Sequence, residues 1–418
     1  MTYYENEIKP ERALLVSVDT GDFDAEASLA ELYELARSAG ADPVAEVTQK
    51  RESPDGATCV GSGRLEEIKA LCEHEEINLL IFDLELTPTQ IRNLERETDV
   101  RVIDRTMLIL DIFASRARSR EGKLQVELAQ LRYMLPRLTG KGAALSRLGG
   151  GIGTRGPGES KLETDRRHIR RRIESLKEQL SQVEHHRAQL RRRREKDGVV
   201  TAAIVGYTNA GKSTLMNCLT EAGVLAEDKL FATLDPTARA LRLPSGASIM
   251  LIDTVGLVRR LPHHLVEAFK STLEEAANAD MILNVCDASS EEAQVHLEVT
   301  RELLKELGGG DRPVVPVLNK CDLVPELAAL PMIGGAVRIS ARTGEGIDRL
   351  LQEIEERLPV RMRRVELLLP FSEGGLVADI RREGALLSEE YTAGGIAVTA
   401  LLDARLLSRA EPYLTREQ

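Results

Sequence analysis

Residues 202–214, AAIVGYTNAGKST, determine what kind of domain occupies the centre of this chain. The stretch places Gly206, four further residues and then Gly211-Lys212-Ser213 directly after an apolar, strand-like run and before the helical run STLMNCLTEAG. Glycines in such a turn let successive backbone N–H groups point inward around phosphates, and the N-terminus of the following helix adds a favourable dipole. The stretch therefore predicts a phosphate-binding loop between a strand and a helix of a parallel α/β domain.

Three side chains and one backbone N–H suit a magnesium-bound triphosphate. The Lys212 ammonium can reach the outer phosphates, and the Ser213 hydroxyl can coordinate Mg²⁺. Asp253-Thr-Val-Gly256 follows the apolar run SIMLI, which puts a carboxylate near the ion and a glycine whose N–H can contact the γ-phosphate. The two motifs therefore predict the phosphate and magnesium half of a nucleotide site.

Two later motifs indicate that the base is guanine. Asn319-Lys-Cys-Asp322 follows the run PVVPVL, and the Asp322 carboxylate can accept hydrogen bonds from guanine N1–H and from its exocyclic amine, an arrangement that adenine does not offer. The run ISAR, which ends at Arg342, fits a loop whose backbone contacts the base. Each motif alone is as easily a common loop, but four motifs in this order favour a GTP-binding domain.

The remaining sequence divides into segments around this domain. From Ala13 to Thr106, the runs ALLVSV, PVAEVT, NLLIFD and VRVID alternate with helical stretches, which is typical of a small parallel α/β domain. After Pro359, the runs VELLLP, EGGLVADIRREG and EEYTAGGIAVTALL indicate a small α+β domain. Because 418 residues exceed what one core supports, we predict an N-terminal α/β domain (1–115), a helical hairpin (116–197), a P-loop GTPase domain (198–359) and a C-terminal α+β domain (360–418).

The hairpin is predicted from two apolar seams with steps of three and four residues. The first seam comprises Leu124, Leu128, Leu131, Leu135 and Leu138, and the second Ile169, Ile173, Leu176, Leu180 and Val183, with Leu162 and Leu190 seven residues beyond its ends. We expect the two helices to pair antiparallel, so that each seam covers the other. The alternative is one helix packed on a neighbouring domain, with the other partly free.

The connector of this hairpin contains LGGGIGTRGPG, residues 148–158. Its G-x-G-x-x-G spacing resembles a dinucleotide fingerprint, but no strand precedes it, so the match is weak. At a hairpin tip, glycines remove side-chain bulk and let the backbone enter a narrow RNA crevice, with Arg147 and Arg155 placed to meet phosphates. A disordered connector is the alternative, and ordering on binding is compatible with both.

Charge and composition limit the partners. The net charge of −11 disfavours indiscriminate nucleic-acid binding, whereas residues 161–196 carry thirteen Lys and Arg against six Asp and Glu. This run is either a phosphate-binding face or only a solvated helix face. The five cysteines form no C-x-x-C pair, and neither a targeting pattern nor a long apolar run is present, so we expect a cytoplasmic protein without a zinc site.

Over nearly its full length the chain resembles the HflX family of GTPases, relatives of the Obg group. Beyond the GTP-binding motifs, the resemblance rests on VGSGRLEEI (60–68), SRLGGGIGTRGPGESKLETDRRHIRRRI (146–173) and LFATLDPTAR (230–239). It implies GTP hydrolysis, binding to ribosomal RNA of the large ribosomal subunit, and separation of stalled or idle ribosomes, often under stress. We also expect a protein that is monomeric when free, binds no DNA and spans no membrane, while peripheral membrane association stays open.

The resemblance identifies LFATLDPTAR as switch I, which makes Thr233 the second magnesium ligand beside Ser213. We therefore predict Lys212, Thr233 and Gly256 as catalytic residues, GTP as substrate and Mg²⁺ as cofactor. The predicted nucleotide-binding residues are Gly206, Tyr207, Thr208, Asn209, Ala210, Gly211, Lys212, Ser213, Thr214, Phe231, Ala232, Thr233, Leu234, Asp235, Asp253, Thr254, Val255, Gly256, Asn319, Lys320, Cys321, Asp322, Ser340, Ala341 and Arg342.

Three positions qualify these expectations. Arg64 stands where the family commonly has Lys, so we interpret VGSGRLEEI as a glycine turn that opens a helix rather than as a nucleotide site. Leu257 follows the DTVG motif where Ras-type relatives carry a water-orienting Gln, so hydrolysis is expected to be slow or to borrow a group from ribosomal RNA, a reordered switch or a cation. Asn209 matches the position that some potassium-dependent relatives use, which gives the hypothesis of a K⁺ requirement.

Two other functions are compatible with the sequence. The protein could be an RNA-binding or anti-association factor for which GTP is a largely structural ligand. It could also be a signalling switch with protein effectors. Measuring multiple-turnover hydrolysis with and without large subunits distinguishes the anti-association factor from a GTPase. Salt-dependent ribosome binding would argue against the signalling switch.

Overall fold

A computed structural model of the chain describes residues 10–138, 157–196, 199–220, 231, 236–260, 265, 273–306, 308, 312–324, 333–358, 363–402 and 404–417. The contacts divide it into two compact units. Unit 1 comprises Met1–Gln182, Lys229–Phe231 and Arg259–Ala268, and unit 2 comprises Val183–Asp228, Ala232–Val258 and Phe269–Gln418. This division follows contact density, so the four predicted domains with their boundaries stay a prediction.

Unit 1 contains a four-stranded parallel sheet of order β2-β1-β3-β4. All four strands lie where the β-branched runs predicted them, at β1 (Arg12–Asp19), β2 (Asp42–Lys50), β3 (Leu79–Phe82) and β4 (Arg101–Asp104). The helices that alternate with or directly follow these strands are α1 (Ala25–Ala39), α2 (Ser62–His74), α3 (Pro88–Thr98) and α4 (Arg105–Arg116). The central strands β1 and β3 are buried almost throughout, as expected for a parallel sheet covered by helices.

Local signals at the helix ends explain where these helices begin. The Asp24 side chain accepts a hydrogen bond from the backbone N–H of Ala27 at the start of α1, and Asp104 accepts one from Met107 at the start of α4. Helix α1 ends at Ala39 and is capped by Gly40, which has φ of 90°, a conformation that glycine adopts without steric cost.

Helices α5 (Arg120–Arg137) and α7 (Pro157–Lys196) pair through the predicted seams. Their shared core comprises Leu124, Leu128, Ile173 and Leu176, with Leu131, Leu135, Ile169 and Leu180 packed against it. On the outside, Arg172 donates hydrogen bonds of 2.6 and 2.7 Å to the Glu127 carboxylate. The seam is shorter than predicted, because Leu190 is 46% exposed. Leu138 caps α5 outside the shared core.

Unit 2 contains a six-stranded sheet of order β10-β9-β8-β5-β7-β6. Five strands are parallel: β5 (Thr201–Gly206), β7 (Ser248–Asp253), β8 (Met281–Asp287), β9 (Val314–Asn319) and β10 (Val337–Arg338). The sixth, β6 (Thr237–Arg242), pairs antiparallel with β7. Its residues are mostly exposed and include no apolar run, so the sequence did not predict this edge strand.

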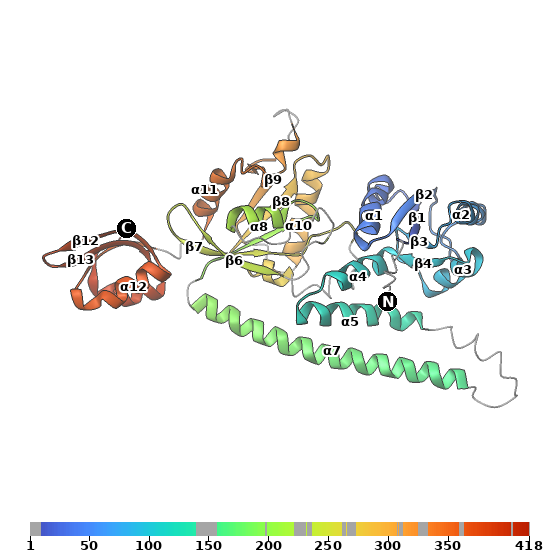
Figure 1. The fold of residues 1–418 in the computed structure, drawn as a ribbon, viewed down its shortest axis with the longest axis horizontal. Coiled ribbons are helices and arrows are strands. Elements are labelled where there is room, and N and C mark those ends of the chain that lie inside the picture. Colours follow the sequence, from blue (N-terminus) through green and yellow to red (C-terminus); the bar gives the residue numbers. More distant parts are fainter. Residues whose placement is uncertain are drawn as a thin grey trace, which may run out of the picture. The chain divides into compact units, whose positions relative to one another are not determined.

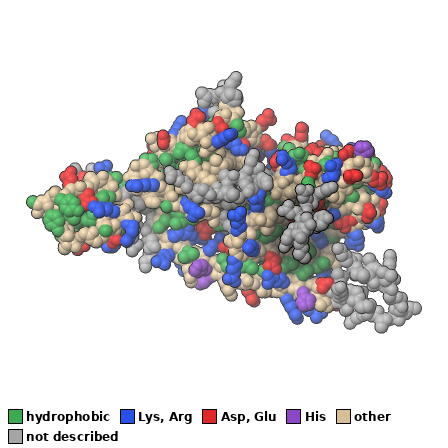
Figure 2. All heavy atoms as spheres, viewed as in Figure 1, with side chains coloured by type: hydrophobic (Ala, Val, Ile, Leu, Met, Phe, Trp, Pro, Cys, Tyr) green, Lys and Arg blue, Asp and Glu red, His purple; other side chains and the backbone are tan. Residues whose placement is uncertain are grey.

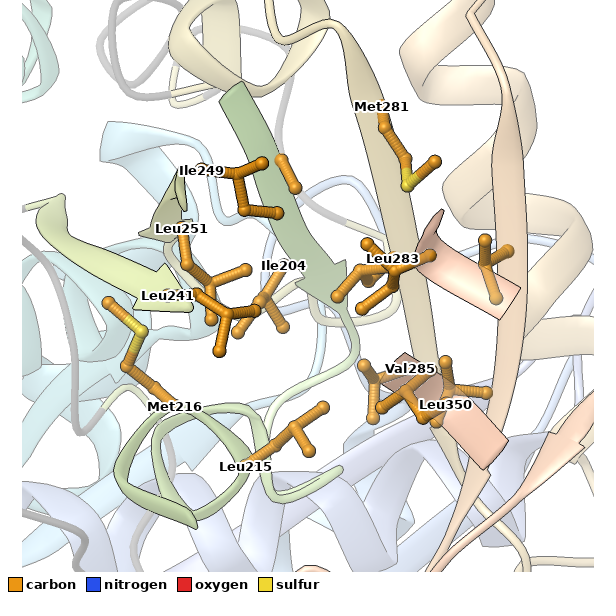
Figure 3. Close-up of a cluster of buried hydrophobic side chains, with 14 of the residues drawn as sticks. Ile204, Leu215, Met216, Leu241, Ile249, Leu251, Met281, Leu283, Val285 and Leu350 are labelled. Carbon is orange, nitrogen blue, oxygen red and sulfur yellow. The ribbon is translucent and has the colours of Figure 1, made fainter. Parts of the chain in front are cut away.

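Helices α8 (Lys212–Thr220), α10 (Ala293–Glu306) and α11 (Ile347–Arg357) cover this sheet. Figure 3 shows Leu215 and Met216 of α8 and Leu350 of α11 reaching toward strand side chains that include Ile204 and Leu283. These side chains belong to one core cluster of unit 2. A buried sheet of this kind fixes the ends of its strands, from which the loops of the candidate site begin.

The C-terminal segment forms an antiparallel sheet of order β12-β13-β11-β14 with helices α12 and α13, as the predicted α+β fold requires. Its elements are β11 (Arg363–Leu369), α12 (Gly374–Glu383), β12 (Ala385–Thr392), β13 (Gly395–Leu402), α13 (Ala404–Ala410) and β14 (Leu414–Glu417). Within the described part of the chain, no helix combines the length and the apolarity needed to cross a bilayer.

Candidate nucleotide site

The backbone of the loop between β5 and α8 requires glycine at two positions. Gly206 has φ of 147°, and a Cβ there would lie 2.0 Å from the carbonyl oxygen of Val285 on the neighbouring strand β8. Gly211 has φ of 86°, and a Cβ there would lie 2.2 Å from the amide nitrogen of Asn319. Both glycines of the motif are therefore required by left-handed backbone and close approach.

Lys212 begins α8 and is buried, with 7% of its surface exposed. Its Nζ donates a 2.7 Å hydrogen bond to the carbonyl oxygen of Tyr207. Burial lowers the pKa of Lys212 to about 8, while the nearby Asp253 acts in the opposite direction. The ammonium is held against the loop backbone, in a setting where anionic phosphates would favour its charged form.

Two oxygen donors meet beside the first turn of α8. The Ser213 hydroxyl donates a 2.9 Å hydrogen bond to Asp253 Oδ2 at the end of β7, and Asp253 is fully buried. Hydroxyl and carboxylate oxygens are the ligands that Mg²⁺ prefers, and the ion is usually held by few protein groups together with substrate phosphates. The predicted second ligand, Thr233, lies outside the described residues, as do Ala232, Leu234 and Asp235.

The end of the DTVG motif is bonded to the phosphate-binding loop. Leu257 donates its backbone N–H to Gly206 at 3.1 Å and accepts at 2.8 Å from the N–H of Thr208. Gly256 packs so closely that a Cβ there would lie 2.6 Å from Thr208 Cγ2. The Leu257 side chain is 6% exposed and apolar, so it offers no group to orient water. The Thr254 hydroxyl donates to the carbonyl oxygen of Ile204 at 2.7 Å.

Asn319 joins the guanine motifs to the phosphate-binding loop. Its amide donates a 2.8 Å hydrogen bond to the carbonyl oxygen of Ala210, and its side-chain oxygen accepts one of 2.9 Å from the N–H of Ala341. Lys320 pairs with Asp287 at 2.7 Å. Asp322 is exposed, so its carboxylate is accessible to a base. The buried Asn319 amide therefore bonds to both the phosphate-binding loop and the second predicted base-contacting loop, and Cys321 N–H adds a 3.1 Å hydrogen bond to the carbonyl oxygen of Ile339.

The structure brings most of the predicted residues together at the carboxyl ends of β5, β7, β9 and β10, where ligands bind in sheets of this type. It also shows a contact that the sequence did not predict. The Tyr207 ring stacks on His296 of α10 at a centroid distance of 3.9 Å and an interplanar angle of 20°. A lone histidine on a helix carries no pattern, so no sequence signal pointed to it. Phe231 lies in unit 1 and packs there on Phe113.

Comparison with known proteins gives matches along most of the chain. Residues 26–114 match the family "GTP-binding GTPase N-terminal", residues 116–194 "GTP-binding GTPase Middle Region" and residues 201–320 "50S ribosome-binding GTPase". A protein named GTPase HflX from Lacrimispora saccharolytica is 53% identical over 95% of this chain and 95% of its own length. One of the same name from Caldanaerobacter subterraneus subsp. tengcongensis is 49% identical over 97% of this chain and 94% of its own.

Among solved structures, a GTP-binding protein from Sulfolobus solfataricus in complex with GDP is 26% identical, with a TM-score of 0.45. The alignment covers 83% of this chain and 98% of that one.

Proposed function

Because this chain belongs to the HflX family of GTPases, we propose that it binds the large ribosomal subunit and, in its GTP state, separates stalled or idle ribosomes. The chain is a GTP hydrolase. In the proposal, contacts to the γ-phosphate select one of two conformations, and hydrolysis resets the protein. The free energy of GTP binding is thus used to choose a conformation rather than to modify a second substrate.

The observation that best supports an RNA target is the division of α7 into two faces. The seam that includes Ile173 and Leu176 is buried against α5, whereas Arg167, Arg170 and Arg171 stay exposed. Figure 2 shows Lys and Arg side chains along the edge that α7 occupies in Figure 1. A rigid helix with one apolar and one basic face fits a protein that docks on a phosphate backbone.

The test is co-sedimentation with large subunits in GTP and GDP, at several salt concentrations, together with a ribosome-splitting assay. We expect GTP-dependent binding that weakens steeply with salt, and splitting only with GTP. The variant Arg170→Glu/Arg171→Glu should bind less, whereas the matched variant Arg92→Glu/Arg96→Glu on α3 should bind normally. Equal binding by both variants, or binding that salt does not affect, would refute the RNA-contacting role of α7.

For catalysis we propose the predicted roles of Lys212, Thr233 and Gly256. The chemistry of the donor set supports Ser213 as a magnesium ligand, since its hydroxyl lies 2.9 Å from the buried carboxylate of Asp253. Mg²⁺ would supply positive charge between the outer phosphates. Lys212 would neutralise the same phosphates from the protein side, and the Gly256 N–H would donate to the γ-phosphate.

The buried, apolar Leu257 supports slow intrinsic hydrolysis that a partner accelerates. Large subunits are therefore expected to raise the turnover rate. Asn209, which is exposed and has φ of 58°, remains the candidate for a K⁺ contact. Equal hydrolysis rates in sodium and potassium buffers would eliminate that role.

The second candidate function is an anti-association factor that binds GTP but barely hydrolyses it, and the apolar side chain at Leu257 favours it. Multiple-turnover measurements decide between the two: no turnover, with or without large subunits, would support the anti-association factor. We further propose a protein that is monomeric when free and acts in the cytoplasm, where its ribosomal partner is found.

A further inference from the structure

The phosphate-binding loop needs support from outside itself. Gly206 and Gly211 have positive φ, and so does Asn209 between them, at 58°. The glycines that permit this conformation also permit many others, so a loop without anchors would leave it whenever no phosphate is bound. Asn209 keeps a left-handed backbone only where its surroundings hold it. The contacts that hold the loop therefore contribute to nucleotide binding.

Two anchors of the loop come from the predicted motifs. Leu257, which follows the DTVG motif, exchanges backbone hydrogen bonds with the residues on both sides of Tyr207. Asn319, which opens the guanine motif, donates to the carbonyl oxygen of Ala210 at 2.8 Å. Both anchors hold backbone groups of the loop, so a side chain of the loop can add a separate anchor.

Tyr207 is the residue at which the loop closes on itself. Its carbonyl oxygen accepts a 2.7 Å hydrogen bond from Lys212 Nζ and a 3.3 Å hydrogen bond from the N–H of Ala210. The position of this carbonyl therefore fixes both the turn of the loop and the lysine proposed to neutralise the outer phosphates. A displacement of Tyr207 would disturb both.

The side chain of Tyr207 is anchored by helix α10. Its ring is buried and stacks on the half-buried imidazole of His296, with 3.9 Å between the ring centroids and 20° between the planes. Both residues belong to unit 2, so the contact lies inside one compact unit. An aromatic pair typically changes an equilibrium constant by about twofold to tenfold. The stack is therefore strong enough to affect the conformation of the loop.

Helix α10 is itself fixed to the central sheet beside His296. The carbonyl oxygen of Leu297, the next residue, accepts a buried 3.0 Å hydrogen bond from the side-chain amide of Asn284 on β8. The Leu297 side chain belongs to a core cluster with Cys286 of β8 and Leu318 of β9. Packed interiors of this kind resist displacement. The imidazole of His296 therefore reaches Tyr207 from a helix that is anchored to the sheet.

We propose that His296 is a positioning residue for nucleotide binding, because its ring holds Tyr207 and thereby keeps the phosphate-binding loop in the conformation that receives phosphates. The backbone N–H groups of such a loop surround the α- and β-phosphates, which GDP and GTP share, so the support acts equally on both nucleotides. The inference rests on nucleotide binding alone and does not depend on any ribosomal role.

Loss of the stack has a defined effect on binding and on turnover. Without it, a smaller fraction of the nucleotide-free protein has a binding-competent loop, and the apparent dissociation constant rises by the inverse of that fraction. Once nucleotide is bound, its phosphates hold the loop. The turnover rate at saturating GTP should therefore keep its value while the affinity falls.

The test measures the turnover rate and the dissociation constants of GDP and of a non-hydrolysable GTP analogue in the full-length protein. His296→Ala removes the stacking ring and should weaken both nucleotides by the same factor, about threefold to tenfold. His296→Phe keeps a planar ring at this position and should bind both nucleotides almost as tightly as the unaltered protein. Val295→Ala is the matched control, because Val295 neighbours His296 on α10 but is 50% exposed, and its dissociation constants should not change.

A double-variant cycle connects the effect to Tyr207. Tyr207→Leu removes the other ring, so adding His296→Ala to it should weaken binding no further. Thermal unfolding checks that each variant is folded. Normal affinity in His296→Ala, a loss for the GTP analogue alone, a His296→Phe protein as weak as His296→Ala, or additive losses in the double variant would each overturn the proposal, whether or not ribosome binding is affected.

Discussion

Lys212 shows how burial prepares a residue for its ligand. Its ammonium is shielded from water and bonded to a carbonyl oxygen, and burial lowers its pKa to about 8. Phosphate oxygens would stabilise the charged form and raise the pKa again. Nucleotide binding and protonation of this lysine are therefore linked.

The sign of the linkage gives a prediction. The nucleotide-free protein loses the lysine proton as the pH rises through about 8, so above that pH GDP binding must take up a proton, and affinity must fall. Calorimetry at about pH 8.5 in buffers of different ionisation enthalpy measures the uptake. Lys212→Arg, whose guanidinium keeps its charge, should bind without uptake. Equal uptake by both proteins would contradict the assignment.

Asn319 and Asp322 belong to one motif, but substitutions at the two positions should change nucleotide binding in different ways. Asn319→Ala removes two hydrogen bonds, to Ala210 and from Ala341, and should weaken GDP and GTP alike by about 1–3 kcal/mol without changing base preference. Asp322→Asn should instead weaken guanine nucleotides and favour xanthine nucleotides, because the exocyclic amine of guanine would meet an amide donor. Titrations with GDP and XDP test both variants. A change of base preference in Asn319→Ala would show that Asn319 contacts the base.

At the scale of elements, the stability of the hairpin is concentrated in its seam. Leu176 is fully buried between α5 and α7, so Leu176→Ala should lower the free energy of unfolding by about 2–4 kcal/mol. Leu190 lies on the same helix but is 46% exposed, so Leu190→Ala is the matched control and should change little. Chemical denaturation of the full chain measures both. Similar losses for the two variants would mean that the seam extends farther than the contacts show.

The tip of the hairpin carries a separate prediction. Residues 149–156 lie outside the described residues, so their proposed role rests on sequence. Shortening this stretch should leave GTP binding unchanged, because the nucleotide motifs are elsewhere in the chain, but should weaken ribosome-stimulated hydrolysis and splitting. Unchanged splitting would reduce the stretch to a linker.

The elements also show which signals sequence carries. The buried strands β1, β3, β5 and β8 were predicted because short, continuous apolar runs bounded by turns are typical of strands in the middle of a covered sheet. The loop residues of the site were predicted because phosphate and guanine chemistry limits which side chains serve. Strand β6 was missed because its exposed residues carry neither periodicity nor motif.

At the scale of the whole molecule, contacts between distant residues were beyond prediction. Arg260 meets Asp83 across 177 positions of sequence, and nothing in either neighbourhood marks the pair. The stacking of Tyr207 on His296 is of the same kind. Such contacts depend on how whole helices and strands pack together, so the identities of the single residues do not predict them. The division into four domains, likewise, remains a prediction from composition and periodicity.

The boundaries of the two units have a consequence for how the protein can be dissected. The chain crosses between the units at 182/183, 228/229, 231/232, 258/259 and 268/269. A single proteolytic cut at one crossing therefore leaves the two units tied together by the other four. A truncation that removes the N-terminal fold also removes Phe113, which contacts Phe231, and Asp83 and Ser28, which contact Arg260. A point substitution at Arg260 removes only the contacts of that side chain and leaves all five crossings intact.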